Sequence, residues 1–146
     1  MKALCLKQPY ASWVAEGPKT IETRTWRTKF RGRFLVVASL GTDLISELGF
    51  ERVMQTDVWK LPVPSEYFRI PSDTYYFPRG QALATVKDCR LMTEEDEKAA
   101  CCELYDGAWA WLLADVVKIE PFPVKGQLSF FEVPYEEPQT KLTEAT

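Results

Sequence analysis

Hydrophobic and polar positions along the chain predict about six strands and two or three short helices. The alternation over residues 2–7 predicts a first strand. The unbroken apolar run over residues 34–38, FLVVA, predicts a strand that is buried on both faces. Alternation, or a high content of β-branched and aromatic residues, predicts four more strands, at 20–27, 81–91, 109–119 and 128–133.

The helices are predicted to be short. Residues 10–15 follow a proline, which suits a first helical turn, and Gly17 stops them. Apolar spacing predicts an amphipathic helix over 43–54, and Thr93 opens an acidic, capping-box-like start to a helix that ends near residue 104. Since long helices do not separate the strands regularly, a doubly wound parallel sheet is disfavoured. We expect an α+β protein, mainly β, built as a small and mostly antiparallel β-barrel of about six strands.

One domain over residues 1–133 accounts for most of the chain, which has 146 residues and an ordinary hydrophobic share of 46%. The polar, acidic tail over 134–146 is expected to fray. Residues 59–80 contain four prolines and several aromatic residues, which predicts a long surface loop. Loops of that length in a small domain often have a function.

The sequence contains no stretch of about 20 apolar residues, so we expect no membrane-spanning segment. The first residues lack an apolar core followed by a small-residue cleavage site, which argues against a signal peptide. We expect a cytoplasmic protein, or a nuclear one if the source is eukaryotic.

The cysteines and the lack of histidine exclude several classes of site. The chain has four cysteines, no CxxC pair and no histidine, so the paired ligands of a structural zinc site are missing. Ser-His-Asp and Cys-His catalysis are excluded for the same reason. We therefore expect no metal and no cofactor, and we interpret the cysteines as small apolar residues in a reducing compartment.

Positive charge is concentrated between residues 19 and 33. This segment carries six cations and one acid, a local charge of +5 in a chain whose net charge is −3, so the remainder carries −8. An acidic protein that gathers cations in one segment is expected to bind an anion there. The six cations are Lys19, Arg24, Arg27, Lys29, Arg31 and Arg33.

The predicted strand 20–27 brings three kinds of side chain to one face. Glu22, Arg24 and Trp26 share that face, because alternate residues of a strand point the same way. The carboxylate can accept from a base amine, the guanidinium can bind a phosphate or a base edge, and the indole can stack on a base. The alternative is that Glu22 and Arg24 only neutralise each other beside a packed Trp26.

Further cations are candidates for contacts with phosphates. The turn after this strand presents Arg27, Lys29 and Arg31, and a second turn presents Lys125. Such side chains can hold a nucleic-acid backbone without reading its sequence. The alternative is an ordinary solvated surface, which a run of charges often forms.

The first strand and the first helix meet at residues that can line a pocket. Gln8 and Tyr10 can place an amide and a phenol there, and Ser39, just after the run 34–38, is also a predicted binding residue. The alternative for Gln8 and Tyr10 is a helix start with no binding role.

Several of these residues belong to one longer pattern. Its parts are Leu4-x-Leu6-x-Gln8-Pro9-Tyr10-Ala11, Gly17-x-Lys19-x-Ile21-Glu22-x-Arg24-x-Trp26-x-Thr28, Arg31-Gly32, Ala38-Ser39, Trp109-x-Trp111-x-Leu113 and Pro121-x-Pro123-x-Lys125-Gly126. The pattern covers most of residues 2–133 and resembles the ASCH domain, the homology domain of a transcription coactivator family.

The resemblance implies a β-barrel related to the PUA fold, with a cleft beside the GxKxxExR motif. It implies that the cleft binds RNA, DNA or a modified nucleoside. Lys19, Glu22 and Arg24 are carried over as cleft residues, with Gln8 and Tyr10 as their neighbours.

Three functional hypotheses remain open. We favour a non-catalytic module that binds RNA, DNA or a modified nucleotide in the cleft. The second is an amidohydrolase that acts on a modified nucleoside such as acetylated cytidine, with Lys19 and Glu22 as catalytic residues. The family members with that activity have a threonine where this chain has Glu22. The third is an adaptor in a transcription- or translation-linked assembly that binds a protein partner through the loop 59–80.

Overall fold

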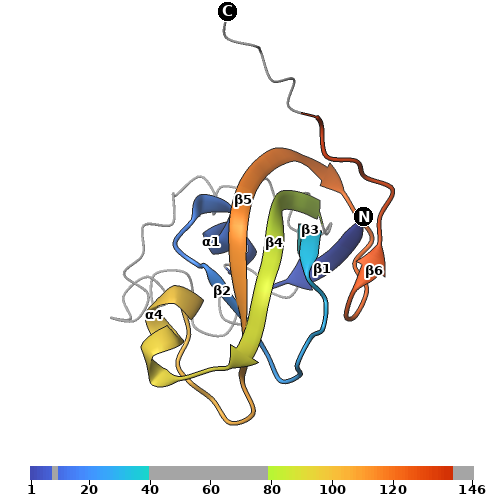
Figure 1. The fold of residues 1–146 in the computed structure, drawn as a ribbon. Helices are drawn as coiled ribbons and strands as arrows, with labels where there is room; N and C mark the ends of the chain where they lie inside the picture. Colours follow the sequence, from blue (N-terminus) through green and yellow to red (C-terminus); the bar gives the residue numbers. More distant parts are fainter. Residues whose placement is uncertain (8–9, 40–78, 140–146) are drawn as a thin grey trace, which may run out of the picture.

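Six strands form one sheet in the computed structural model, which describes residues 1–7, 10–39 and 79–139 (Figure 1). The strands lie in the order β2-β5-β4-β3-β1-β6. Their bounds are Lys2–Leu6 for β1, Ile21–Arg24 for β2, Gly32–Ala38 for β3, Arg79–Leu91 for β4, Trp109–Pro123 for β5 and Phe131–Glu132 for β6.

The sheet is mixed, so the α+β class is confirmed but the expected barrel is only partly supported. Strands β1 and β3 pair in parallel, and the other four pairings are antiparallel. A parallel pair needs a long crossover, and here the chain forms helix α1 and strand β2 between β1 and β3. Among the described strands, β2 and β6 are the two ends of the order and do not pair, so the sheet is not closed into a barrel.

Strands β4 and β5 run side by side over most of their length and curve strongly (Figure 1). Their register shifts at three places, between Gly80 and Ala82, Leu83 and Thr85, and Val86 and Asp88. Such irregularities bend a strand and increase its twist, which lets the two longest strands wrap around the core.

Strand β5 continues through Pro121 and Pro123, where the sequence predicts an interruption. Along this end, β5 pairs with β4, and the described residues provide no partner on its other edge. A proline lacks the N–H donor and is tolerated where a strand has an unpaired edge. The edge position therefore explains the extra length of β5.

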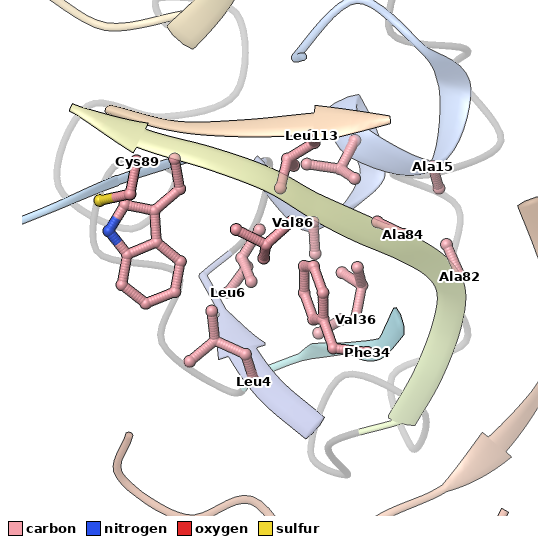
Figure 2. Close-up of a cluster of buried hydrophobic side chains, with 14 residues drawn as sticks. Leu4, Leu6, Ala15, Phe34, Val36, Ala82, Ala84, Val86, Cys89 and Leu113 are labelled. Atoms are coloured by element: carbon pink, nitrogen blue, oxygen red, sulfur yellow. The ribbon is translucent and has the colours of Figure 1, made fainter. Parts of the chain in front are cut away.

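The main core lies between β1, β3, β4, β5 and helix α1, which spans Tyr10–Glu16 (Figure 2). Strand β3 contributes to both faces of the sheet, as its apolar run predicts. Phe34 and Val36 belong to the cluster in Figure 2, whereas Leu35 and Val37 belong to a second buried cluster.

The helices follow the sequence predictions with one clear difference. Helix α1 begins at Tyr10 as predicted and ends at Glu16, one residue later than predicted, and Gly17 takes a left-handed φ of 105° just after it. Helix α4 covers only Glu97–Ala100, after a 3₁₀ turn, η4, over Glu94–Asp96. It ends before residue 104 because Cys101 adopts a left-handed φ of 56°. None of the described helices is long and apolar enough to cross a membrane.

Two predicted strands are shorter than expected. Strand β2 ends at Arg24 rather than at residue 27, and β6 covers two residues of the predicted 128–133. Ser129, with a left-handed φ of 57°, breaks the extended chain just before β6. The predicted helix 43–54 and residues 59–78 of the predicted loop lie outside the described residues, whereas residues 79 and 80 begin β4.

The beginning of the acidic tail contacts the sheet. The Tyr135 ring stacks on Phe122 with centroids 5.2 Å apart, and the Glu137 carboxylate accepts two hydrogen bonds from Arg33, at 2.9 and 3.0 Å. Residues 140–146 lie outside the described residues.

Candidate functional site

A cavity of about 610 Å³ opens between β1, β2 and the segment that joins β5 to β6. Its volume falls within the range of about 300 to 1,000 Å³ that is usual for small-molecule sites. Five of the predicted site residues line it: Tyr10, Lys19, Glu22, Arg24 and Ser39.

Lys19 is the most deeply buried charged group at the cavity, with an exposed fraction of 1%. Its Nζ donates to the carbonyl oxygens of Ile21, at 2.7 Å, and of Ala100, at 2.5 Å. The same atom lies 3.6 Å from Oε1 of Glu22. These three partners surround the ammonium group, so Lys19 is positioned to hold Glu22 and to tie β2 to the end of α4.

Glu22 is also buried, with an exposed fraction of 6%. Its Oε1 accepts a hydrogen bond from the Thr23 N–H at 2.9 Å, and its Oε2 accepts one from Arg24 Nη2 at 3.1 Å. Each carboxylate oxygen has two lone pairs, so Glu22 keeps capacity to accept from a ligand in the cavity.

Arg24 lies beside Glu22 and is partly exposed. Its Nη2 also donates to the Cys5 carbonyl oxygen at 2.7 Å, which links β2 to β1 across the cavity. Within the described part of the chain, the Nε and Nη1 groups donate to no protein acceptor. Arg24 can therefore offer these donors to a ligand.

Tyr10 supplies an aromatic wall to the cavity. Its ring meets Trp13 edge to face at 5.6 Å, and the Lys19 ammonium lies 5.2 Å from its centroid. Burial and, to a lesser extent, Cys102 and Glu22 raise the pKa of Tyr10 well above its ordinary value. The phenol is therefore protonated at neutral pH and can donate a hydrogen bond. Gln8, its predicted neighbour, lies outside the described residues.

Trp26 does not line the cavity with Glu22 and Arg24. The alternation of β2 ends at Arg24, and the Trp26 carbonyl instead accepts a hydrogen bond from Trp111 Nε1 at 3.3 Å. The Trp26 ring packs edge to face on Trp111, with centroids 4.7 Å apart, and also meets Phe130. The structure therefore brings together the acid and the guanidinium of the predicted trio but not the indole.

The cations of the turn between β2 and β3 lie outside the cavity, and Arg27 and Arg31 interact with nearby groups. The Arg27 guanidinium lies 5.9 Å from the centroid of Trp109. Arg31 donates to the carbonyl oxygens of Thr28 and Phe30 and forms an ion pair of 3.5 Å with Asp88. These side chains are held against the protein, although Arg27 and Arg31 remain exposed.

Lys29 and Lys125 are also exposed and outside the cavity. Neither makes an ion pair with another described residue. Lys125 directly precedes the segment 126–129, which forms part of the cavity wall. Among the residues predicted to contact phosphates, Lys125 is therefore the one that directly precedes a lining segment in the sequence.

Several lining residues were missed by the sequence prediction. Cys5, Leu6 and Lys7 join the cavity from the end of β1, together with Thr23 and the segment 126–129. The alternation of β2 points Thr23 away from Glu22, but the residue lies at the cavity edge with its backbone N–H on the Glu22 carboxylate. Nothing in the local sequence predicts that 126–129 lines the same cavity as β2, since the segment leads into β6, which pairs with β1.

The thiols of Cys5 and Cys101, near the site, are poor nucleophiles. Burial raises the pKa of Cys101 to about 11 and also raises that of Cys5. Both thiols are therefore protonated at neutral pH. Among the residues that the structure describes, no group of three or more His, Cys, Asp or Glu side chains could hold a metal ion.

Comparison with known protein families finds a match over most of the chain. The pattern that defines the ASCH domain matches residues 4–123, which include Lys19, Glu22 and Arg24 in the cavity, most of β1 and all of β2 to β5. No curated protein sequence is similar enough to count as a match. Since the matched region spans most of the chain, the chain belongs to the ASCH domain family.

Proposed function

We propose that this protein is a nucleic-acid-binding module that takes one unpaired nucleobase into the cavity. The observation that carries the proposal is the pairing of Glu22 with Arg24 inside the cavity. The carboxylate keeps acceptor capacity, and the guanidinium keeps donors that no described residue uses. Bases display donors and acceptors together on their edges, so this combination suits a base better than a simple anion.

The charge of the cavity favours a ligand that carries phosphates. Among the described residues, its walls contain three cations, Lys7, Lys19 and Arg24, and one acid, Glu22. The whole chain has a net charge of −3, so this positive excess is local. Positive walls raise the local concentration of a polyanion and speed its association.

The surroundings of the cavity offer contacts with the strand that carries the base. Lys125 directly precedes one wall of the cavity and is exposed. Tyr10 gives the cavity an aromatic surface on which a base can stack, in place of the expected Trp26. RNA and single-stranded DNA both present this chemistry.

The amidohydrolase alternative has less support. Lys19 would have to act as a base or activate a nucleophile, but its Nζ donates to two backbone carbonyls and adjoins Glu22. Incubation with acetylated cytidine, followed by chromatography for cytidine, tests this reaction. Release of cytidine that the Lys19→Met variant does not catalyse would replace the binding proposal with an enzymatic one.

The adaptor alternative rests on the loop 59–80. Residues 59–78 lie outside the described residues, so the geometry adds no argument to it. Pull-down with and without this loop would identify a protein partner.

Binding is tested with labelled 12-residue RNA and DNA single strands in a fluorescence anisotropy titration at several salt concentrations. We expect salt-sensitive binding, with a log-log slope of about −0.7 for each phosphate contact. Glu22→Gln should change the preference between bases, because it alters the hydrogen-bonding groups in the cavity. A thermal melt checks that the variant is folded. Absence of binding to any strand at low salt would overturn the proposal.

A further inference from the structure

Leu128 is the most exposed of the large apolar side chains in the described part of the chain, with an exposed fraction of 95%. A single exposed leucine needs no explanation on an ordinary surface. Leu128, however, lies at the edge of the cavity that holds Glu22 and Arg24. An exposed apolar side chain therefore stands at the entrance to a site whose buried groups are charged.

The backbone directly after Leu128 has an uncommon conformation and is followed by a packed aromatic side chain. Ser129 adopts a left-handed φ of 57°, an uncommon conformation for a residue with a side chain. Phe130, next in the chain, stacks on Trp111 with centroids 5.6 Å apart and rings 23° from parallel. The chain is thus anchored directly after the exposed leucine. Backbone conformations of this kind persist where the surrounding structure imposes them, often at binding sites.

We propose that Leu128 is a wedge that enters the base stack and fills the gap left by the nucleobase in the cavity. The inference rests on the proposed function and specifies its ligand. Proteins that unstack a base commonly insert an apolar side chain between base steps. The ligand would be a base within a stacked or paired strand, rather than a free nucleoside.

The charges beside Leu128 favour a nucleic acid over an apolar protein surface as the occupant. Lys125 precedes it by three residues and is exposed, and Lys7 lies in the wall of the same cavity. An apolar tip among cations matches a base stack, which is apolar between its bases and anionic along its backbone.

The experiment compares wild-type protein with Leu128→Ser and with a matched control, Leu91→Ser. Leu91 is also exposed, at 60%, but it ends β4 and does not line the cavity. Two labelled RNA probes are used, a 12-residue single strand and a 12-base-pair duplex with one mismatch. A 2-aminopurine next to the mismatch reports unstacking through its fluorescence.

We expect Leu128→Ser to bind the mismatched duplex at least tenfold more weakly than wild type and to lose the rise in 2-aminopurine fluorescence. Its affinity for the single strand should stay within about twofold, because a flexible strand needs no wedge. Leu91→Ser should match wild type on both probes.

The contrary outcomes separate the wedge from the binding proposal. Equal affinity of wild type and Leu128→Ser for the duplex, or an equal loss on both probes, would overturn the wedge while single-strand binding by wild type upholds the proposed function. No binding of either probe by wild type would overturn both.

Discussion

The cations between residues 19 and 33 occupy two regions that are neutralised in different ways. At the cavity, Lys19 and Arg24 share one buried acid, Glu22, and Arg24 keeps donors for a ligand. On strand β3 and the turn before it, Arg33 and Arg31 each have their own acid, Glu137 and Asp88. The density of positive charge along the sequence therefore does not show which cations line the cavity. Lys19 and Arg24 are distinguished by sharing one buried acid there.

Substitution of Lys19, the buried cation of the cavity, should have the largest effect on stability. We expect Lys19→Met to lower the free energy of unfolding by roughly 3 to 5 kcal/mol, because Glu22 and two carbonyl oxygens would lose a buried partner. Denaturation by urea measures the change. The exposed Lys29→Met variant is the control and should differ from wild type by less than about 0.5 kcal/mol. A loss of less than about 1 kcal/mol for Lys19→Met would show that the two regions do not differ in stability.

A third ion pair provides an intermediate case. Asp96 receives two hydrogen bonds from Arg90, at 2.7 and 2.8 Å, and one from the Thr93 N–H at 2.9 Å. The bonds from Arg90 in particular lower the pKa of Asp96 to about 2, from an ordinary 3.8. We expect Asp96→Asn to lower the free energy of unfolding by roughly 1 to 3 kcal/mol at pH 7, measured by urea denaturation.

The pH dependence of this pair has a definite sign. Since the folded-state pKa is the lower one, the stabilisation is present above about pH 4 and is lost as the pH falls toward 2. The difference between wild type and Asp96→Asn should therefore shrink over that range. A constant difference from pH 7 to pH 2 would contradict the assignment to this carboxylate, and Glu95→Gln, at an exposed neighbour, serves as the control.

The second-largest difference between the two regions is expected in the affinity for nucleic acid. We expect Arg24→Gln to weaken binding to single-stranded RNA by about tenfold, or roughly 1.4 kcal/mol, because it removes the cavity's unused donors. Anisotropy titrations at one salt concentration measure this change. Arg33→Gln is the matched control and should leave binding unchanged, since Arg33 already bonds to Glu137, Thr85 and the Asp115 carbonyl. Equal losses for the two variants would remove the distinction between the regions.

The smallest effect is expected at Arg31. Its ion pair with Asp88 is exposed and long, at 3.5 Å, so the side chain can exchange that partner for a phosphate. Arg31→Gln should weaken binding to all sequences by about twofold to fivefold and reduce the salt slope by about 0.7. A sequence-dependent loss would instead place Arg31 at a base, and an unchanged slope would show that it remains with Asp88.

The sequence predicts local features of the fold well, because they depend on neighbouring residues. The run 34–38 is buried on both faces, and Glu22 and Arg24 meet because they alternate on one strand. Trp26 departs from that face because β2 ends at Arg24 and Trp111, from β5, bonds to its carbonyl. The end of β2 is thus set by a distant residue that the alternation does not include.

The ion-pair partner of Arg33 could not be predicted either, because it also depends on residues that are far apart in the sequence. Glu137 and Arg33 are 104 positions apart, and they meet only because the tail returns to the sheet. The parallel pairing of β1 with β3 likewise depends on how the chain crosses over between them. The segment 126–129 reaches the cavity through this arrangement, so the sequence did not mark Leu128 as part of the site.

The hydrogen bond from Lys19 to the Ala100 carbonyl joins the cavity to helix α4, so a movement of α4 away from β2 would break it. The adjacent Thr20 N–H donates to the Ala99 carbonyl at 2.9 Å, so the same movement would break both bonds. A ligand that holds Glu22 in place would therefore slow amide hydrogen exchange at Thr20, which does not line the cavity. The exchange rate of the Thr20 amide would therefore report whether the cavity is occupied, although the ligand does not contact Thr20.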